Sequence, residues 1–339
     1  MLIYTALIVT YANRYKFVEQ VVEALIREGI STIILVDNAS ADESKIFYKN
    51  LVEKNSKIKL IQHSQNLGSA GGFHSGLEFI LNNIISDFIW ILDDDNVPDI
   101  GSLNNLIYTR KLLINENSNN DVVLYSYRGD SWLDDKLAVT NGYIKGYKKN
   151  NFIGFNFFDF FKTFFLNKSR SKKIKYPLVL VEVGPYGGMF LSMNTLKLVG
   201  LPHKDFFLYA DDHEFSLRFD SYNINQYLVY NSRLKDIHFT FSSGNKFFSE
   251  QTSELKLFYS IRNHVFLSQS FINNNFYYIV NKLTYISINL LIALPIIIKK
   301  PKIALERIIL IKNAIYDGEK GKLGKVTNIG NRAQSNNFN

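Results

Sequence analysis

The chain has 339 residues and a formal net charge of +8, from 39 Lys and Arg against 31 Asp and Glu. Hydrophobic residues make up 46% and charged residues 21%, a balance typical of folded proteins that excludes global disorder. Cysteine is absent, which excludes disulfides and thiolate metal sites, so any metal must bind oxygen or imidazole ligands. The excess positive charge indicates an anionic partner: a nucleotide, a phospholipid surface or nucleic acid.

The first 93 residues alternate between strand-like and helix-like patterns. Continuous apolar segments of strand length alternate with segments that have the length and period of helices. The predicted strands are 2–10, 32–37, 58–63 and 87–93, and the predicted helices are 15–28, 41–54 and 72–85. This alternation is typical of βαβ units, so the sequence predicts an α/β fold with a mostly parallel sheet.

Polar side chains follow each of these predicted strands. In parallel sheets, ligands bind at the carboxyl ends of the strands, where the loops converge. The polar residues at these ends are Thr10, Asn13, Arg14, Asp37, Asn38 and Asn66, followed by the run Asp93, Asp94 and Asp95. We therefore expect these side chains to share one edge of the sheet.

Glycines precede the third predicted helix, at Gly68, Gly71 and Gly72. Such glycines allow a ligand to approach the backbone closely at a helix N-terminus that faces an anion. Their spacing matches neither a dinucleotide-binding nor a Walker A motif, so a simple glycine turn before a helix explains them as well.

The segment "WILDDDNVP" places three carboxylates directly after a buried strand. Mg²⁺ and Mn²⁺ prefer oxygen ligands, and carboxylates two residues apart on an extended segment point the same way. The sequence therefore predicts that Asp93 and Asp95 share one cation while Asp94 points elsewhere. The alternative is a solvated turn before a helix, for which Pro98 and Asp99 are start signals.

A second acidic cluster, Asp211, Asp212 and Glu214, opens a predicted helix after the short predicted strand 187–192. Acids at this position cap a helix and complement its dipole, but two adjacent carboxylates can also orient a hydroxyl and accept its proton. His238 follows a further apolar segment, and alone it fits a core or surface residue as well as a ligand.

Seven of these segments occur together in one order. They are "TALIVTYANR", "ILVDNASAD", "QNLGSAGGFHSG", "WILDDDNVP", "GPYGGMFLS", "YADDHEFSLR" and "IHF". This order and spacing resemble the inverting family 2 glycosyltransferases with a GT-A fold, most closely their bacterial galactofuranosyl- and rhamnosyl-transferase branch. The resemblance covers about residues 1–240, and 257–263 and 315–324 look like its C-terminal motifs.

The resemblance implies a role for each matching residue. Asp93 and Asp95 would hold Mn²⁺ or Mg²⁺ on the donor diphosphate with His238, Asp212 would be the catalytic base, and its neighbours would bind the acceptor. The implied acceptor-binding residues are Asp211, Glu214 and Gly188, and the donor-binding residues are Thr10, Asn13, Arg14, Asp37, Asn66, Gly71 and Asp94. The implied donor is UDP- or dTDP-linked galactofuranose or rhamnose, and the implied acceptor is a polyprenyl-diphosphate-linked glycan.

The sequence also predicts an organisation into regions. We expect a catalytic domain over 1–245 with an aromatic and basic insert at 145–176, a helical membrane-associating region over 246–325, and a disordered tail over 326–339. The uncharged stretch 283–298 has 16 residues, fewer than the roughly 20 that span a bilayer, and it contains Pro295. Because the N-terminus also lacks a signal-peptide pattern, we expect a cytoplasmic protein at the inner face of the cell membrane.

Three other functions remain as alternatives. A sugar nucleotidyltransferase would carry a glycine-rich loop after the first strand, which "IVTYANRYKF" lacks. A non-catalytic glycan-binding or scaffold protein would not need Asp212 together with the acid run. A nucleic-acid-binding protein is disfavoured because the basic residues cluster beside phenylalanines instead of along a polar stripe.

Overall fold

A computed structural model describes residues 2–114, 121–129, 133–142, 146–158, 174–238 and 253–326 of the chain. The chain divides into two compact units. The sheet unit comprises Met1–Lys145, Arg170–Lys204 and Asp212–Phe239, and the helical unit comprises Gly146–Ser169, Asp205–Asp211 and Thr240–Asn339. These units therefore do not follow the boundary predicted at residue 245. The tail 327–339 and most of the predicted insert, 159–173, lie outside the described residues.

Nine strands form one sheet within the described residues, in the order β3-β2-β1-β4-β8-β6-β9-β5, with β7 also paired to β9. Their bounds are β1 Tyr4–Thr10, β2 Thr32–Asp37, β3 Ile58–Gln62, β4 Phe88–Asp93, β5 Asn96–Pro98, β6 Val122–Tyr127, β7 Leu178–Val181, β8 Met189–Ser192 and β9 Asn225–Asp236. Strands β1 to β4 pair in parallel, as does β6 with β9, whereas β8 runs antiparallel between β4 and β6. The carboxyl ends of β1, β2, β3, β4 and β6 therefore lie at one edge of the sheet.

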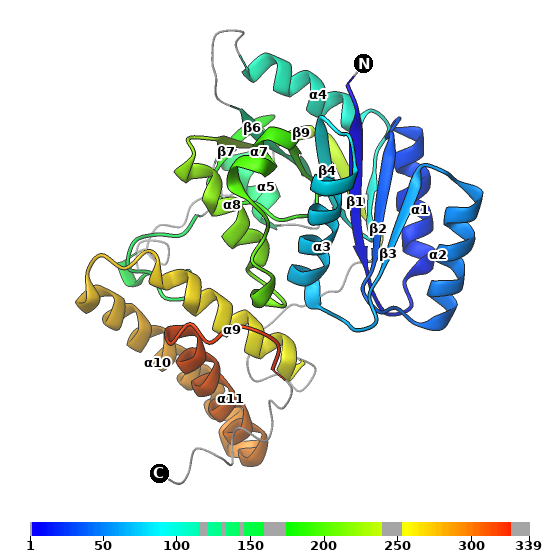
Figure 1. Ribbon diagram of the computed structural model, residues 1–339. Coiled ribbons are helices and arrows are strands. Elements are labelled where there is room, and N and C mark those ends of the chain that lie inside the picture. The colour runs from blue at the N-terminus through cyan, green and yellow to red at the C-terminus, as the bar shows by residue number, and fades with distance from the viewer. Residues whose placement is uncertain are drawn as a thin grey trace. The chain divides into compact units, whose positions relative to one another are not determined.

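Helices cover both faces of this sheet (Figure 1). The helices of the sheet unit are α1 Tyr15–Arg27, α2 Asp42–Lys54, α3 Gly68–Asn83, α4 Ser102–Leu113, α5 Leu133–Asn141, α7 Met193–Val199 and α8 Asp211–Ser221, and a 3₁₀ turn spans Lys204–Phe206. Alternate residues of β1 point to opposite faces, so Leu7 packs in the core beneath α3 and Ile8 packs in the core beneath α1. The four strands and three helices predicted before residue 93 are confirmed, with small shifts at their ends.

The glycines of α3 have a packing function. A Cβ on Gly72 would lie 2.5 Å from Val9 Cγ1, and a Cβ on Gly76 would lie 2.4 Å from Leu7 Cδ1. The absence of side chains therefore lets α3 lie directly against β1. Helix α3 begins at Gly68, four residues before the predicted start, and the Asn66 side chain accepts a hydrogen bond from the Gly68 amide at 2.8 Å.

The helical unit contains α9 Glu254–Gln269, α10 Asn275–Lys299 and α11 Pro301–Glu319, which confirms the predicted helical C-terminal region. Its core joins residues of all three helices, among them Tyr259, Tyr278 and Leu310, to Phe152 of the segment 146–158. Among the described helices, α10 is long and apolar enough to cross a membrane.

Candidate active site

The three adjacent acids lie at the carboxyl edge of the sheet, as predicted, but not on one extended segment. Strand β4 ends at Asp93 and β5 begins at Asn96, so Asp94 and Asp95 occupy the turn between them. The argument that Asp93 and Asp95 point the same way assumed strand geometry through the run. That assumption does not hold, because Asp94 and Asp95 form a turn, and the shared cation stays a prediction.

Arg14 binds two of the three acids. Its Nε donates to Asp94 Oδ2 at 2.8 Å and its second guanidinium nitrogen donates to Asp95 Oδ2 at 2.7 Å. Thr10 Oγ1 donates to the same Asp94 oxygen at 2.7 Å, and Arg14 approaches His238 Nδ1 to 3.4 Å. Burial alone lowers the pKa of Arg14, but the two carboxylates outweigh it and raise that pKa. Five of the predicted site residues are thus in one contact network.

Asp93 is held differently. Burial and the neighbouring Asp95 carboxylate raise the pKa of Asp93 to about 7, and the positive charge of Arg128 opposes that rise. The chain passes close to Asp93 at Gly187, where a Cβ would lie 2.6 Å from Asp93 Oδ2. Any larger residue at 187 would press against this carboxylate.

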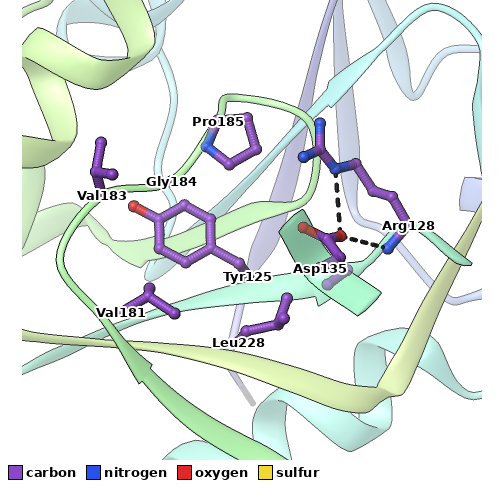
Figure 2. A pocket seen from close by; sticks show the side chains of 9 residues that line it. Tyr125, Arg128, Asp135, Val181, Val183, Gly184, Pro185 and Leu228 are labelled. Carbon is purple, nitrogen blue, oxygen red and sulfur yellow. Dashed lines mark hydrogen bonds and ion pairs between the residues drawn. The ribbon is translucent and has the colours of Figure 1, made fainter. Parts of the chain in front are cut away.

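Arg128 was not among the predicted site residues. It follows β6 at the same edge, and Figure 2 shows it beside Asp135 in a small pocket that Tyr125 and Pro185 also line. The Arg128 amide donates to Asp135 Oδ2 at 2.9 Å, and its Nε lies 3.5 Å from the same oxygen. The pocket has room for about one water molecule. A sequence signal was available, because Arg128 directly follows the apolar segment of β6, but that strand was not predicted.

Asp212 lies in the first turn of α8, where its Oδ1 accepts a hydrogen bond from the His213 amide at 2.8 Å. Its charge contributes, after burial, to the raised pKa values of Asp93 and Tyr125, so Asp212 lies within electrostatic reach of the acid run. Asp211 is buried. Glu214 is engaged by Arg218, with contacts of 2.8 and 2.5 Å to the guanidinium, so a structural ion pair already occupies this predicted acceptor-binding residue.

The segment that leads into α8 is strained and tightly held. Phe207, Tyr209 and Ala210 have positive φ values of 64°, 67° and 61°, a conformation that L-residues rarely adopt. Asn263 Nδ2 on α9 donates to the Phe206, Leu208 and Tyr209 carbonyls at 2.9, 2.8 and 2.8 Å. Arg262 donates to the Phe206 carbonyl at 3.0 Å and to Asn263 Oδ1 at 2.8 Å. This pair fixes the backbone directly before Asp211 and Asp212.

The remaining predicted donor-binding residues lie in neighbouring loops of the same edge. Asp37 accepts from the Ser40 amide at 2.8 Å, and Asn66 is bonded to the Gly68 amide as described above. The Asn13 side chain is hydrogen-bonded to the first turn of α2: it donates to Glu43 at 2.8 Å and accepts from Ser44 at 2.9 Å.

Two of the predicted glycines have backbone reasons for their identity. A Cβ on Gly71 would lie 2.5 Å from Leu67 Cβ. Gly188 has a φ of +95° and bonds the Ile91 carbonyl and the Ser126 amide, at 2.9 and 3.0 Å. The donor-binding role of Gly71 and the acceptor-binding role of Gly188 stay predictions.

The acid run suits a divalent cation by the chemistry of its donors. Carboxylate oxygens are the ligands that Mg²⁺ and Mn²⁺ prefer, and the pKa of Asp93 is raised first by burial and then by the Asp95 charge, which a cation would neutralise. Within the described residues no three acids or histidines converge as a metal-binding group. Binding at Asp95 would compete with the Arg14 ion pair, which holds one of the Asp95 oxygens.

Comparison with known proteins identifies part of the chain. The model of the family described as "Glycosyl transferase family 2" matches residues 6–174. The matched segment covers just under half of the chain. It includes Arg14 and the acid run but ends before Asp212 and His238. A search of curated protein sequences finds no significant match.

Solved structures of glycosyltransferases share the fold. GalNAc-T7 with UDP, GalNAc and Mn²⁺ is 14% identical with a TM-score of 0.51, over 78% of this chain and 48% of that one. A mannosyltransferase from Pyrobaculum calidifontis with GDP-Man and Mn²⁺ is 11% identical with a TM-score of 0.50, over 95% and 76%. S. aureus TarS 1–349 with UDP-GlcNAc is 13% identical with a TM-score of 0.50, over 94% and 80%.

These identities establish the fold alone. This chain spans about half of the GalNAc-T7 chain. The predicted GT-A fold, a mixed and mostly parallel sheet flanked by helices with a helical C-terminal region, is confirmed. The finer resemblance to galactofuranosyl- and rhamnosyl-transferases stays a prediction.

Proposed function

We propose that this protein transfers a sugar from a nucleotide-diphosphate donor to a hydroxyl group, with inversion at the anomeric carbon. The observation that carries the proposal is the gathering of Arg14, Asp93, Asp94 and Asp95 at the carboxyl edge of a family 2 sheet, within electrostatic reach of Asp212. Ligands of such sheets bind at this edge.

The donor would lie across the ends of β1, β2 and β4. Thr10, Arg14 and Asp94 form one hydrogen-bonded group there, in which Thr10 and Asp94 are buried and Arg14 is partly exposed, and Asp37 lies at the end of the next strand. We propose that Asp37 and Asn66 contact the nucleoside and that Arg14 faces the diphosphate. A guanidinium suits this role because its planar donors match phosphate oxygens.

A bound Mn²⁺ or Mg²⁺ would be held by Asp93 and Asp95, with His238 as the candidate third ligand. Such an ion supplies charge neutralisation on a diphosphate leaving group. Because Arg14 holds one oxygen of Asp95, the ion would bind the other Asp95 oxygen or displace the guanidinium, and the absence of a side chain at Gly187 leaves the Asp93 carboxylate uncrowded.

Asp212 would accept the proton of the acceptor hydroxyl. As the acceptor oxygen forms its bond to the anomeric carbon, the bond from that carbon to the phosphate oxygen breaks and the nucleoside diphosphate leaves. The proton passes to an Asp212 carboxylate oxygen, and no covalent enzyme intermediate is needed. Asp211 and Gly188 remain the candidates for orienting the acceptor, whereas the Arg218 ion pair makes Glu214 a weaker one.

We propose galactofuranose or rhamnose as the sugar, carried by UDP or dTDP, and a polyprenyl-diphosphate-linked glycan as the acceptor. Such an acceptor would be met at the inner face of the cell membrane, so the protein would work there as a peripheral membrane protein. These choices rest on the motif resemblance, and the exposed apolar helix α10 supports the location.

The test is release of nucleoside diphosphate from a panel of nucleotide-sugars with Mn²⁺, with and without membrane extract as the source of acceptor. Asp212→Asn should lower turnover by about 10²-fold while donor binding, measured by calorimetry, is kept. Asp220→Asn is the matched control, because Asp220 is an exposed acid on the same helix and should turn over normally.

Wild-type turnover by Asp212→Asn would remove the proposed base. Donor binding without any turnover by the wild type, with every sugar and acceptor source, would favour the non-catalytic glycan-binding alternative. Release of pyrophosphate from a nucleoside triphosphate and a sugar phosphate would favour the nucleotidyltransferase alternative.

A further inference from the structure

Helix α10 carries an exposed apolar stripe along its whole length. Residues at spacings of three and four fall on one side of a helix. The apolar members of the stripe are Phe276, Ile279, Leu283, Leu290, Leu294 and Ile298, with exposed fractions between 39% and 78%. Water-exposed apolar area of this extent is costly in a soluble protein and marks a binding surface.

The opposite side of α10 faces the helical unit. Tyr278, Asn281 and Ala293 are buried there, and Lys282 Nζ lies 2.5 Å from Glu319 Oε1 at the end of α11. Asn281 bonds the Asn150 carbonyl at 2.7 Å and the Phe157 amide at 2.8 Å. The helix is therefore already docked on one side, and the apolar stripe is the side that its own unit leaves uncovered.

Three lysines lie where α10 turns into α11. Lys299, Lys300 and Lys302 are exposed and follow directly on the uncharged stretch 283–298. An apolar stripe that ends in a cluster of cations complements an anionic lipid surface, because apolar side chains enter the acyl boundary while lysines meet the headgroups. A protein partner would need an apolar surface for the stripe and acidic residues for the lysines at its end.

We propose that α10 binds the surface of an anionic membrane and lies in its plane, without crossing it. The proposal extends the location given above and does not depend on the sugar transfer. The phenylalanine Phe158 would add to the same surface, since it is 64% exposed and its ring lies 6.4 Å from that of Tyr277 on α10.

The connection to α11 argues against a spanning helix. Only Lys300 separates the two helices, and the contact of Lys282 with Glu319 shows that α11 returns antiparallel beside α10. If α10 crossed the bilayer, α11 would have to cross with it and take Glu306, Arg307 and Lys312 into hydrocarbon. Charged residues at that depth are strongly disfavoured, whereas in-plane binding leaves them at the headgroups or in the protein.

The first experiment is flotation of the full chain with vesicles of equal parts phosphatidylglycerol and phosphatidylcholine. Leu291→Glu, which adds a charge to the uncovered side of α10, should reduce the bound fraction about tenfold or more. Ile46→Glu on α2 is the matched control, since Ile46 and Leu291 are exposed to similar degrees, 62% and 64%. Asp212→Asn should float as the wild type does, which separates failure of this proposal from failure of the proposed chemistry.

Charge is tested on the same vesicles. Replacing Lys299 and Lys302 together by Gln should weaken binding roughly 20-fold, from about fivefold for each cation near an anionic surface. Binding that is equal on vesicles of phosphatidylcholine alone would overturn the electrostatic part of the proposal.

Depth is tested by single-cysteine labelling, which is direct because the chain has no cysteine. With vesicles present, Ser287→Cys carrying an environment-sensitive dye should shift to shorter wavelength. Lys300→Cys should still react with a membrane-impermeant maleimide added outside. Protection of Lys300→Cys until detergent is added would show a spanning helix and overturn in-plane binding. No vesicle binding, together with a wild-type dimer that Leu291→Glu converts to monomer, would assign the surface to a second copy of the chain.

Discussion

Carboxylates lie beside an arginine at both ends of the parallel strands: Asp121 at the amino end and the three adjacent acids at the carboxyl end. The two groups differ in how fully hydrogen-bond donors occupy the carboxylate oxygens. At the amino edge, before β6, Asp121 accepts hydrogen bonds from Arg110 at 2.7 Å, from the Val122 amide at 2.9 Å and from Thr195 at 2.9 Å, as well as from Ser192. Burial alone raises the pKa of Asp121, but these donors outweigh it and lower that pKa.

At the carboxyl edge the donors are shared unequally among the three adjacent acids. Arg14 serves Asp94 and Asp95, while Asp93 keeps a pKa of about 7, raised by burial and by Asp95. The Asp212 carboxylate accepts from the His213 amide of its own helix turn, whereas Asn263 binds the backbone carbonyls of Phe206, Leu208 and Tyr209. Donors lower the pKa of the carboxylate that stabilises the fold, whereas burial and like charge raise the pKa of Asp93, as is common in functional sites.

The largest expected effect is the loss of turnover in a variant of Asp93, which tests whether this acid differs in function from Asp121. Asp93→Asn should lower turnover by about 10²-fold, as removal of a group that stabilises reaction charge does. It should not lower the free energy of unfolding, because it relieves repulsion within three adjacent carboxylates. Steady-state kinetics and urea denaturation at pH 7 measure the two quantities. An active but destabilised variant would mean that Asp93 is structural, like Asp121.

Asp121→Ala should do the reverse. It leaves Arg110, Ser192 and Thr195 without their common acceptor, so the free energy of unfolding should fall by about 2 kcal/mol. Turnover per folded molecule should be unchanged, since Asp121 lies at the edge away from the proposed donor site. Asp42→Ala is the control, because the ion pair of Asp42 with Lys45 is exposed and should contribute less than about 0.5 kcal/mol. Equal losses of unfolding free energy in the two variants would mean that Asp121 contributes no more to stability than an exposed ion pair.

The strands that could be predicted from the sequence are β1 to β4, whose signals are local. The strands β1 to β4 are continuous apolar segments separated by helical periodicity, so their existence and parallel pairing could be inferred. The acid run could be placed at the carboxyl edge for the same reason. The turn at Asp94 and Asp95 could not, because β5 exists only through pairing with the distant strand β9. A strand end that depends on pairing with a distant strand has no signal in the local sequence.

The positioning of Asp212 was equally beyond local pattern. Asn263 lies more than 50 residues after the carbonyls it binds, and its donors meet backbone atoms, which carry no sequence identity. The motif "LFYSIRN" could be noticed but not connected to residues 206–210. Arg128 was missed because no strand was predicted at 122–127, so the rule that polar residues after a strand line the carboxyl edge was not applied there.

A smaller effect is expected at Asn263. It tests whether hydrogen bonds to the backbone before Asp212 position this candidate base. Asn263→Ala should lower turnover roughly tenfold with little change in KM, because the strained segment before Asp212 loses three hydrogen bonds and small displacements of a catalytic group reduce the rate strongly. Asn281→Ala is the matched control, since Asn281 is also buried in the helical unit but bonds other backbone groups. If both variants lost stability and turnover alike, Asn263 would support the fold in general.

The smallest expected effect is the pH dependence of the Asp121 cluster. The folded pKa of Asp121 lies below the unfolded value, which is about 3.9 for an aspartate. Its contribution is therefore fully present above the unfolded pKa and is lost as pH falls through the folded pKa. The stability difference between wild type and Asp121→Asn should accordingly be constant near neutral pH and shrink on acidification below the unfolded pKa of about 3.9. Denaturation curves at a series of pH values measure it, and a difference that grew on acidification would show that the donors around Asp121 do not favour its charged form.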